Sequence, residues 1–131
     1  MGPLVIEGTA KTPSIRFDAE TGLLEIKGRS IPENSIDFYK PLIDWLDRYS
    51  RGVKSKTALH VQLEYFNTSS SKCILDVFKK LEAIRMAGNE TAVLWHYERD
   101  DEDMLEAGED YAGIINVPFR MIEIAEVDGG A

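Results

Sequence analysis

The sequence contains few of the residues from which catalytic and metal sites are usually built. A single cysteine, Cys73, leaves no partner for a disulfide within the chain. The two histidines, His60 and His96, are fewer than the three or four ligands of a zinc site. No glycine-rich phosphate loop and no dinucleotide fingerprint is present. We therefore expect a protein that is not an enzyme and that needs no cofactor and no metal ion.

Long apolar runs and clusters of positive charge are also missing. No stretch approaches the roughly 20 apolar residues that span a bilayer, and residues 1–7 lack the basic start of a signal peptide. The chain has 15 basic and 23 acidic residues, for a net charge of -8. Nucleic acids and anionic membranes bind clustered Lys and Arg, so both are poor partners for this chain. We expect a cytoplasmic protein that binds neither nucleic acid nor membranes.

The negative charge is concentrated in residues 98–110. Eight acids and one base give this segment a charge of -7, which leaves -1 for the rest of the chain. The carboxylates of residues 100–103 are of the type that divalent cations prefer, but the glycine and the spacing of a calcium loop are missing. Acids in the first turn of a helix also complement its dipole. A solvated helix start is therefore favoured, and a partner surface or a small metal-dependent enzyme are the alternatives.

The 131 residues suit a single domain, residues 1–131, in which Gly129, Gly130 and Ala131 form a frayed tail. Apolar periodicity predicts strands over 4–6, 14–18, 23–27, 57–66, 91–97 and 118–125, with a hairpin loop from Asp18 to Gly22. It predicts helices that begin near Asn34 or Ser35, within residues 67–71, and in the acidic segment. Pro41 should kink the first helix or delay its start.

The predicted fold class is α/β, a mixed sheet covered by helices, in the order β-β-β-α-β-α-β-α-β. The strand over residues 91–97 is mostly apolar, which is typical of a strand buried on both faces.

The run Asn67-Thr68-Ser69-Ser70 lies where a strand ends and a helix begins, so several backbone N–H groups lack partners. A hydroxyl at such a place usually caps the helix, and we expect Thr68 to do so. The same geometry suits a phosphate, because free N–H groups and the positive helix end accept its oxygens. Lys72, four residues after Thr68, would lie on the same helical face and pair with it.

Four segments together resemble the SiaC family of bacterial regulatory phosphoproteins. They are residues 12–15 (Thr-Pro-Ser-Ile), 32–35 (Pro-Glu-Asn-Ser), 65–72 (Tyr-Phe-Asn-Thr-Ser-Ser-Ser-Lys) and 95–97 (Trp-His-Tyr) with the acids that follow. The resemblance implies a STAS-like fold, similar to anti-sigma-factor antagonists, whose phosphorylated hydroxyl also lies at a helix start. It makes Thr68 the expected phosphoacceptor, although Ser69 and Ser70 are adjacent rivals.

The resemblance also implies partners. A serine/threonine kinase would phosphorylate Thr68 and a PP2C-like phosphatase would remove the phosphate. The unphosphorylated form would bind and stimulate a target such as a diguanylate cyclase, and so affect cyclic di-GMP and biofilm formation. The expected contact surface consists of Thr68 and its surroundings, namely Tyr65, Phe66, Asn67, Ser69, Ser70 and Lys72. The alternative is a STAS-like ligand-binding or scaffold module in which Thr68 is only a helix cap.

Overall fold

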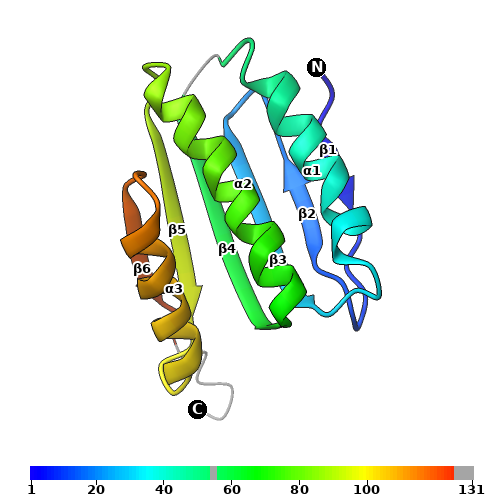
Figure 1. The fold of residues 1–131 in the computed structure, drawn as a ribbon, viewed down its shortest axis with the longest axis vertical. Coiled ribbons are helices and arrows are strands. Elements are labelled where there is room, and N and C mark those ends of the chain that lie inside the picture. The colour runs from blue at the N-terminus through cyan, green and yellow to red at the C-terminus, as the bar shows by residue number, and fades with distance from the viewer. Residues whose placement is uncertain (54–55, 126–131) are drawn as a thin grey trace.

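The computed structural model describes residues 1–53 and 56–125 and is built on a six-stranded sheet (Figure 1). Its strands lie side by side in chain order: β1 (Leu4–Ile6), β2 (Ser14–Phe17), β3 (Leu23–Ser30), β4 (Thr57–Phe66), β5 (Thr91–Tyr97) and β6 (Phe119–Glu123). The helices are α1 (Ser35–Tyr49), α2 (Thr68–Met86) and α3 (Glu102–Ile114). The predicted fold class and element order are confirmed. The predicted tail at residues 129–131 lies outside the described residues.

The sheet is antiparallel in its first part and parallel in the rest. β1, β2 and β3 form a meander, and β3 to β6 run parallel to one another. The predicted hairpin loop joins β2 to β3, where Gly22 adopts a φ of 72° and donates its N–H to the Asp18 carbonyl. Glycine reaches this left-handed region at little cost, which explains why the turn falls there.

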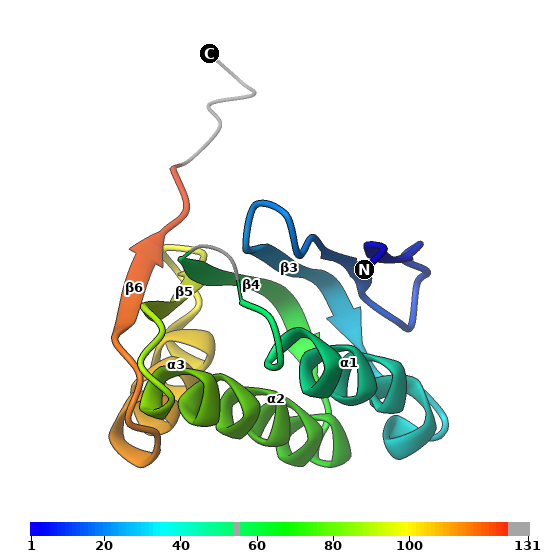
Figure 2. The same cartoon turned by 90° about the horizontal axis from the view of Figure 1, so that it is seen from above.

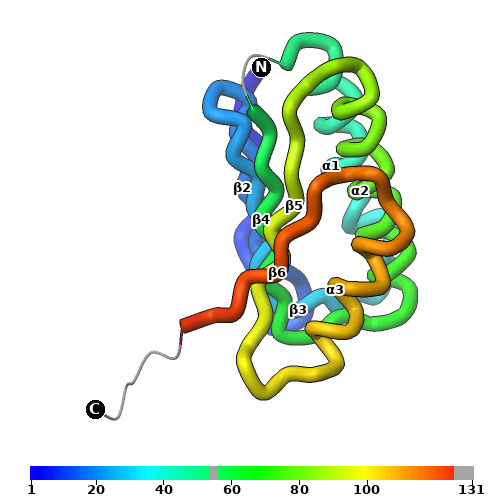
Figure 3. Tube along the Cα trace, turned by 90° about the vertical axis from the view of Figure 1, so that its left-hand side faces the viewer, coloured from blue at the N-terminus to red at the C-terminus, as the bar shows by residue number. Residues whose placement is uncertain are grey.

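All three helices lie on one face of the sheet (Figures 2 and 3). Each parallel strand is the spatial neighbour of the one before it, so every crossover moves in the same direction across the sheet. Since such crossovers are nearly always right-handed, their helices collect on the same side. The other face is left without helices.

This arrangement corrects the expected burial of β5. Thr91, Val93 and Trp95 are buried against the helices, but Ala92, Leu94 and His96 are only half-buried. β5 is therefore not buried on both faces. Its composition is apolar, but no described helix covers the second face of the sheet. The helices cover one side of the mixed sheet only.

The core lies between the sheet and the helix layer. Its largest fully buried side chains are Trp45, Trp95, Tyr39, Tyr49, Phe17 and Phe78. α1 begins at Ser35 after the Asn34 cap, which confirms the predicted helix start. The helix continues through Pro41, so of the two alternatives for this proline the delayed start is wrong. Within the described ranges, each helix is too short or too polar to cross a membrane.

Candidate functional site

Thr68 is the first residue of α2 and directly follows the end of β4. Its side chain is exposed. Among the described residues, the hydroxyl of Thr68 forms no hydrogen bond, although the Thr68 carbonyl accepts one from Ser71 Oγ at 2.7 Å. The hydroxyl is therefore accessible and has no internal bond to lose before it reacts.

Asn67, not Thr68, caps α2. The Asn67 backbone is extended, with φ -84° and ψ 173°, and its Oδ1 accepts the Ser70 N–H at 2.8 Å. Such a bond to the amide three residues ahead defines an N-cap. The expectation that Thr68 caps the helix is therefore wrong, and so is the capping role that the alternative of a ligand-binding or scaffold module gave to Thr68. Asn and Thr are both good caps, so the sequence could not separate them.

The two neighbouring serines differ in accessibility. Ser70 is completely buried, and its hydroxyl donates to the Ser30 carbonyl at 3.1 Å and accepts from Ser30 Oγ at 2.9 Å. Ser69 is exposed, but its hydroxyl donates to Asn67 Oδ1 at 3.1 Å and lies 2.7 Å from Ser35 Oγ. Of the three consecutive hydroxyls, that of Thr68 is thus the one that combines exposure with freedom from internal bonds.

The starts of α1 and α2 lie side by side at the same end of the helix layer (Figure 1). The contact between Ser35, the first residue of α1, and Ser69 joins them directly. Close to this contact, the hydroxyl of Tyr39 lies 2.6 Å from Ser30 Oγ. Burial raises the pKa of Tyr39 to about 12. The phenol therefore stays protonated and donates to Ser30. Two positive helix ends in contact favour negative charge at this place.

The remaining predicted site residues lie around Thr68 and differ in exposure. Lys72 is exposed one turn along α2, as predicted. Tyr65 is 53% exposed at the end of β4, whereas Phe66 is half-buried and packs edge-on against Trp95. Lys72 and Phe66 border a groove of about 340 Å³ between α2 and α3, which is lined mainly by apolar side chains: Leu75, Ala107, Tyr111 and Ile114, with Ser71 and Asp110.

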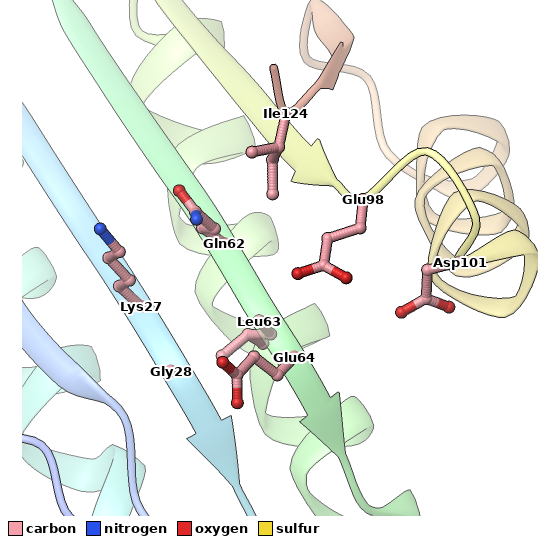
Figure 4. Close-up of a pocket in the computed structure, with 8 residues that line it drawn as sticks. All are labelled: Lys27, Gly28, Gln62, Leu63, Glu64, Glu98, Asp101 and Ile124. Atoms are coloured by element: carbon pink, nitrogen blue, oxygen red, sulfur yellow. The ribbon is translucent and has the colours of Figure 1, made fainter. Parts of the chain in front are cut away.

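A second hollow, of about 370 Å³, lies at the carboxyl ends of β3, β4 and β5 (Figure 4). Lys27 and Gln62 lie beside it, and the carboxylates of Glu64, Glu98 and Asp101 surround it. Asp101 Oδ1 also accepts the Met104 N–H at 3.0 Å as the cap of α3. With three carboxylates against one lysine, this hollow disfavours a phosphate, unlike the start of α2.

The predicted acidic helix start is confirmed. α3 begins at Glu102, and Glu102 and Asp103 are exposed in its first turn, where they complement the helix dipole. In the part of the chain that the structure describes, no three His, Cys, Asp or Glu side chains are placed to hold a metal ion. Cys73 is buried on α2, and burial raises the pKa of its thiol.

The sequence did not reveal that the two histidines meet. His60 on β4 and His96 on β5 lie on the face without helices, with His60 Nδ1 3.0 Å from His96 Nε2. Burial, and then the neighbouring His60, lower the pKa of His96. The two histidines meet because β4 and β5 are neighbours in the sheet. The alternation of strands and helices along the sequence predicts a sheet but not the order of its strands.

These features describe a two-layer α/β domain with an accessible, unbonded hydroxyl at the start of α2. Residues 6–124 match the family model described as "SiaC family regulatory phosphoprotein". The chain belongs to the SiaC family.

The chain is similar to proteins of Pseudomonas aeruginosa over nearly its whole length. It is 35% identical over 121 residues to an uncharacterised protein of strain UCBPP-PA14, covering 92% of this chain and 96% of that protein. It also matches the crystal structure of apo-SiaC with a TM-score of 0.87 and 34% identity, covering 93% of this chain and 99% of that one. A third match, with the same TM-score and identity, is to a chain in the crystal structure of diguanylate cyclase SiaD in complex with its activator SiaC, covering 92% of this chain and 99% of that one.

Proposed function

We propose that this protein is a partner-switching regulator without catalytic activity, reversibly phosphorylated on Thr68. The observation that carries the proposal is the Thr68 hydroxyl, which is exposed and unbonded at the first position of α2. Family membership supports it, because the family is described as one of regulatory phosphoproteins. A serine/threonine kinase adds the phosphate from ATP, and a PP2C-like phosphatase removes it.

The unphosphorylated form binds and stimulates a diguanylate cyclase, and so raises cyclic di-GMP and favours biofilm formation. The support is the complex in which the similar SiaC is the activator of the diguanylate cyclase SiaD. Because ATP and the nucleotide substrate of such a cyclase are cytoplasmic metabolites, we place the switch in the cytoplasm.

The contact surface in this proposal is the start of α2 together with the end of β4. Tyr65 offers an exposed aromatic ring, and the groove beside Phe66 and Lys72 offers apolar surface into which a partner side chain can insert. Aromatic and apolar anchors of this type usually dominate binding energy at protein interfaces. Thr68 lies at the start of this surface, so a change in its charge acts directly on the partner.

Phosphorylation changes that surface more than it changes the fold. It adds about -1.5 to -2 charges and three acceptor oxygens at the Thr68 position. In the free protein, the positive end of α2 and the ammonium group of Lys72 partly neutralise the negative charge of the phosphate. A partner that covers the site must desolvate the phosphate, and an unmatched buried charge costs about 3–5 kcal/mol, which weakens binding more than a hundredfold. The partner is therefore released without refolding.

The test combines phosphosite mapping with binding. The protein purified from its native host should carry a single phosphate on Thr68 in intact-mass and peptide spectrometry, and Thr68→Ala should carry none. In pull-downs, Thr68→Ala should retain a diguanylate cyclase and Thr68→Asp should lose it. Ser50→Ala, which removes a hydroxyl at the C-terminal end of α1, away from the start of α2, serves as the control and should behave like the wild type. An absence of phosphate under all growth conditions, or equal binding by all variants, would refute the proposal.

A further inference from the structure

Ser69 is exposed and adjacent to Thr68, yet its hydroxyl is held on two sides. It donates to Asn67 Oδ1 at 3.1 Å, so the 2.7 Å contact with Ser35 Oγ must have Ser35 as the donor. Both partners are themselves fixed. Asn67 is locked by its capping bond to the Ser70 amide, and Ser35 is 5% exposed in the first turn of α1.

These bonds separate Ser69 from Thr68 chemically. In phosphoryl transfer the hydroxyl oxygen forms a bond to the γ-phosphorus of ATP, the bond to ADP breaks, and the hydroxyl proton passes to the base of the kinase. The oxygen therefore needs a free lone pair and a proton that it can release. Thr68 Oγ1 meets both needs in the folded protein without breaking a bond. Ser69 Oγ keeps one free lone pair, but its proton is bound by Asn67 and its position is fixed by the hydrogen bond that it accepts from Ser35, so both bonds must break before it can turn toward a kinase.

We propose that Ser69 is a latent second phosphoacceptor and that Ser35 keeps it unmodified. The proposal rests on the proposed function, because it needs the ATP-dependent kinase that modifies Thr68. Ser35 then acts as a positioning residue that restricts the kinase to one hydroxyl of a Thr-Ser-Ser run. It lies 34 residues from Ser69 in the sequence and reaches it only because α1 and α2 start side by side.

The test measures the initial rate of phosphate incorporation at each residue by peptide mass spectrometry, in native-host extract with Mg-ATP. Thr68→Ala removes the main acceptor, and Thr68→Ala with Ser35→Ala also removes the contact to Ser69. We expect the double variant to phosphorylate Ser69 about fivefold faster, the factor that corresponds to one ordinary hydrogen bond. Thr68→Ala with Ser35→Thr retains the donor and should stay at the lower rate.

Two further variants separate the loss of this contact from a loss of folding. Ser50→Ala removes a hydroxyl at the other end of α1, where Ser50 Oγ donates to the Asp47 carbonyl at 2.7 Å, and should not change the Ser69 rate. Ser35→Cys replaces the hydroxyl by a weak donor of similar size and should also raise the Ser69 rate. Ser70, which stays buried and bonded to Ser30, should carry no phosphate in any of these variants.

The possible failures are distinguishable. If Thr68 is phosphorylated in the wild type but Ser69 rates are equal with and without the Ser35 hydroxyl, the latent acceptor is refuted and the proposed function stands. Phosphate on Ser70 together with Ser69 in the Ser35→Ala and Ser35→Cys variants would indicate unfolding and would also refute a specific effect of Ser35. If the same extract adds no phosphate to wild-type Thr68, both proposals fail.

Discussion

At the start of α2, two neighbouring side chains have separate roles, because Asn67 caps the helix and the Thr68 hydroxyl is unbonded. We predict that Asn67→Ala lowers the free energy of unfolding by about 1 kcal/mol, the usual cost of a lost N-cap. Thr68→Ala removes no internal bond and should change it by less than about 0.5 kcal/mol. Urea unfolding of both variants checks this. A loss for Thr68→Ala as large as that for Asn67→Ala would mean that Thr68 caps the helix after all.

The histidine pair predicts a pH dependence of stability. The lowered pKa of His96 means that the folded protein binds this proton less readily than the unfolded chain does. As pH falls below about 6.5, the ordinary histidine pKa, the unfolded chain is protonated first, and stability decreases. The decrease ends once pH is below the folded-state pKa of His96. Of the charged neighbours, Glu25 opposes the shift and Lys27 adds to it.

The measurement is urea unfolding between about pH 7.5 and about pH 5, together with NMR titration of both rings. His96→Gln removes the titrating group but keeps a polar side chain, so it should lose less stability than the wild type over this range. Equal losses in the two proteins would contradict the prediction, as would a His96 ring that titrates at or above its ordinary pKa.

At the scale of elements, α3 packs on β5 so closely that only glycine fits at the contact. A Cβ on Gly108 would lie 2.5 Å from Trp95 Cδ1 and 2.9 Å from Met121 Sδ. We predict that Gly108→Ala destabilises the protein by about 1–3 kcal/mol, because the indole or the helix must shift. Gly113→Ala on the same helix meets nothing within 4 Å and should be neutral or stabilise slightly, as alanine favours helix. Thermal unfolding of the pair tests this, and equal melting temperatures would refute close packing as the cause.

Periodicity predicted the elements well where a strand or helix has one clear apolar face. β4 was predicted over its observed range, Thr57–Phe66, because buried and less buried side chains alternate along it up to Leu63. The burial of β5 was predicted wrongly, because its apolar composition does not reveal that every crossover runs in the same direction. β3 extends to Ser30, beyond the predicted residue 27, because Gly28, Arg29 and Ser30 continue the pairing with β4 although none of them has an apolar side chain.

The candidate site was predictable in place but not in detail. A run of cap-forming residues after a strand located the start of α2, and the resemblance singled out Thr68 within it. The sequence could not assign the cap to Asn67, since that depends on the direction of one side chain. It also could not reveal Ser35, because a contact over 34 residues exists only after α1 and α2 have packed together.

At the scale of the whole molecule, the chain order places both helix starts and the end of β4 at one edge, where a charge can act on all three. We predict that phosphorylation of Thr68 leaves the fold intact and raises the free energy of unfolding by about 1 kcal/mol at low salt. The reason is that an anion at a helix N-terminus is stabilised by the unpaired N–H groups and the helix dipole. Far-ultraviolet circular dichroism should be unchanged, while urea unfolding should shift to higher denaturant concentration.

Salt and a matched variant identify the cause of this gain. Exposed charge interactions are screened at high ionic strength, so the gain should shrink in high salt. Lys72→Gln removes the cation one turn after Thr68 and should reduce the gain further, whereas Lys79→Gln, exposed farther along α2, should not. If phosphorylation lowered the stability or changed the dichroism spectrum, the switch would act by unfolding the start of α2, and release of the partner would follow from lost structure rather than from added charge.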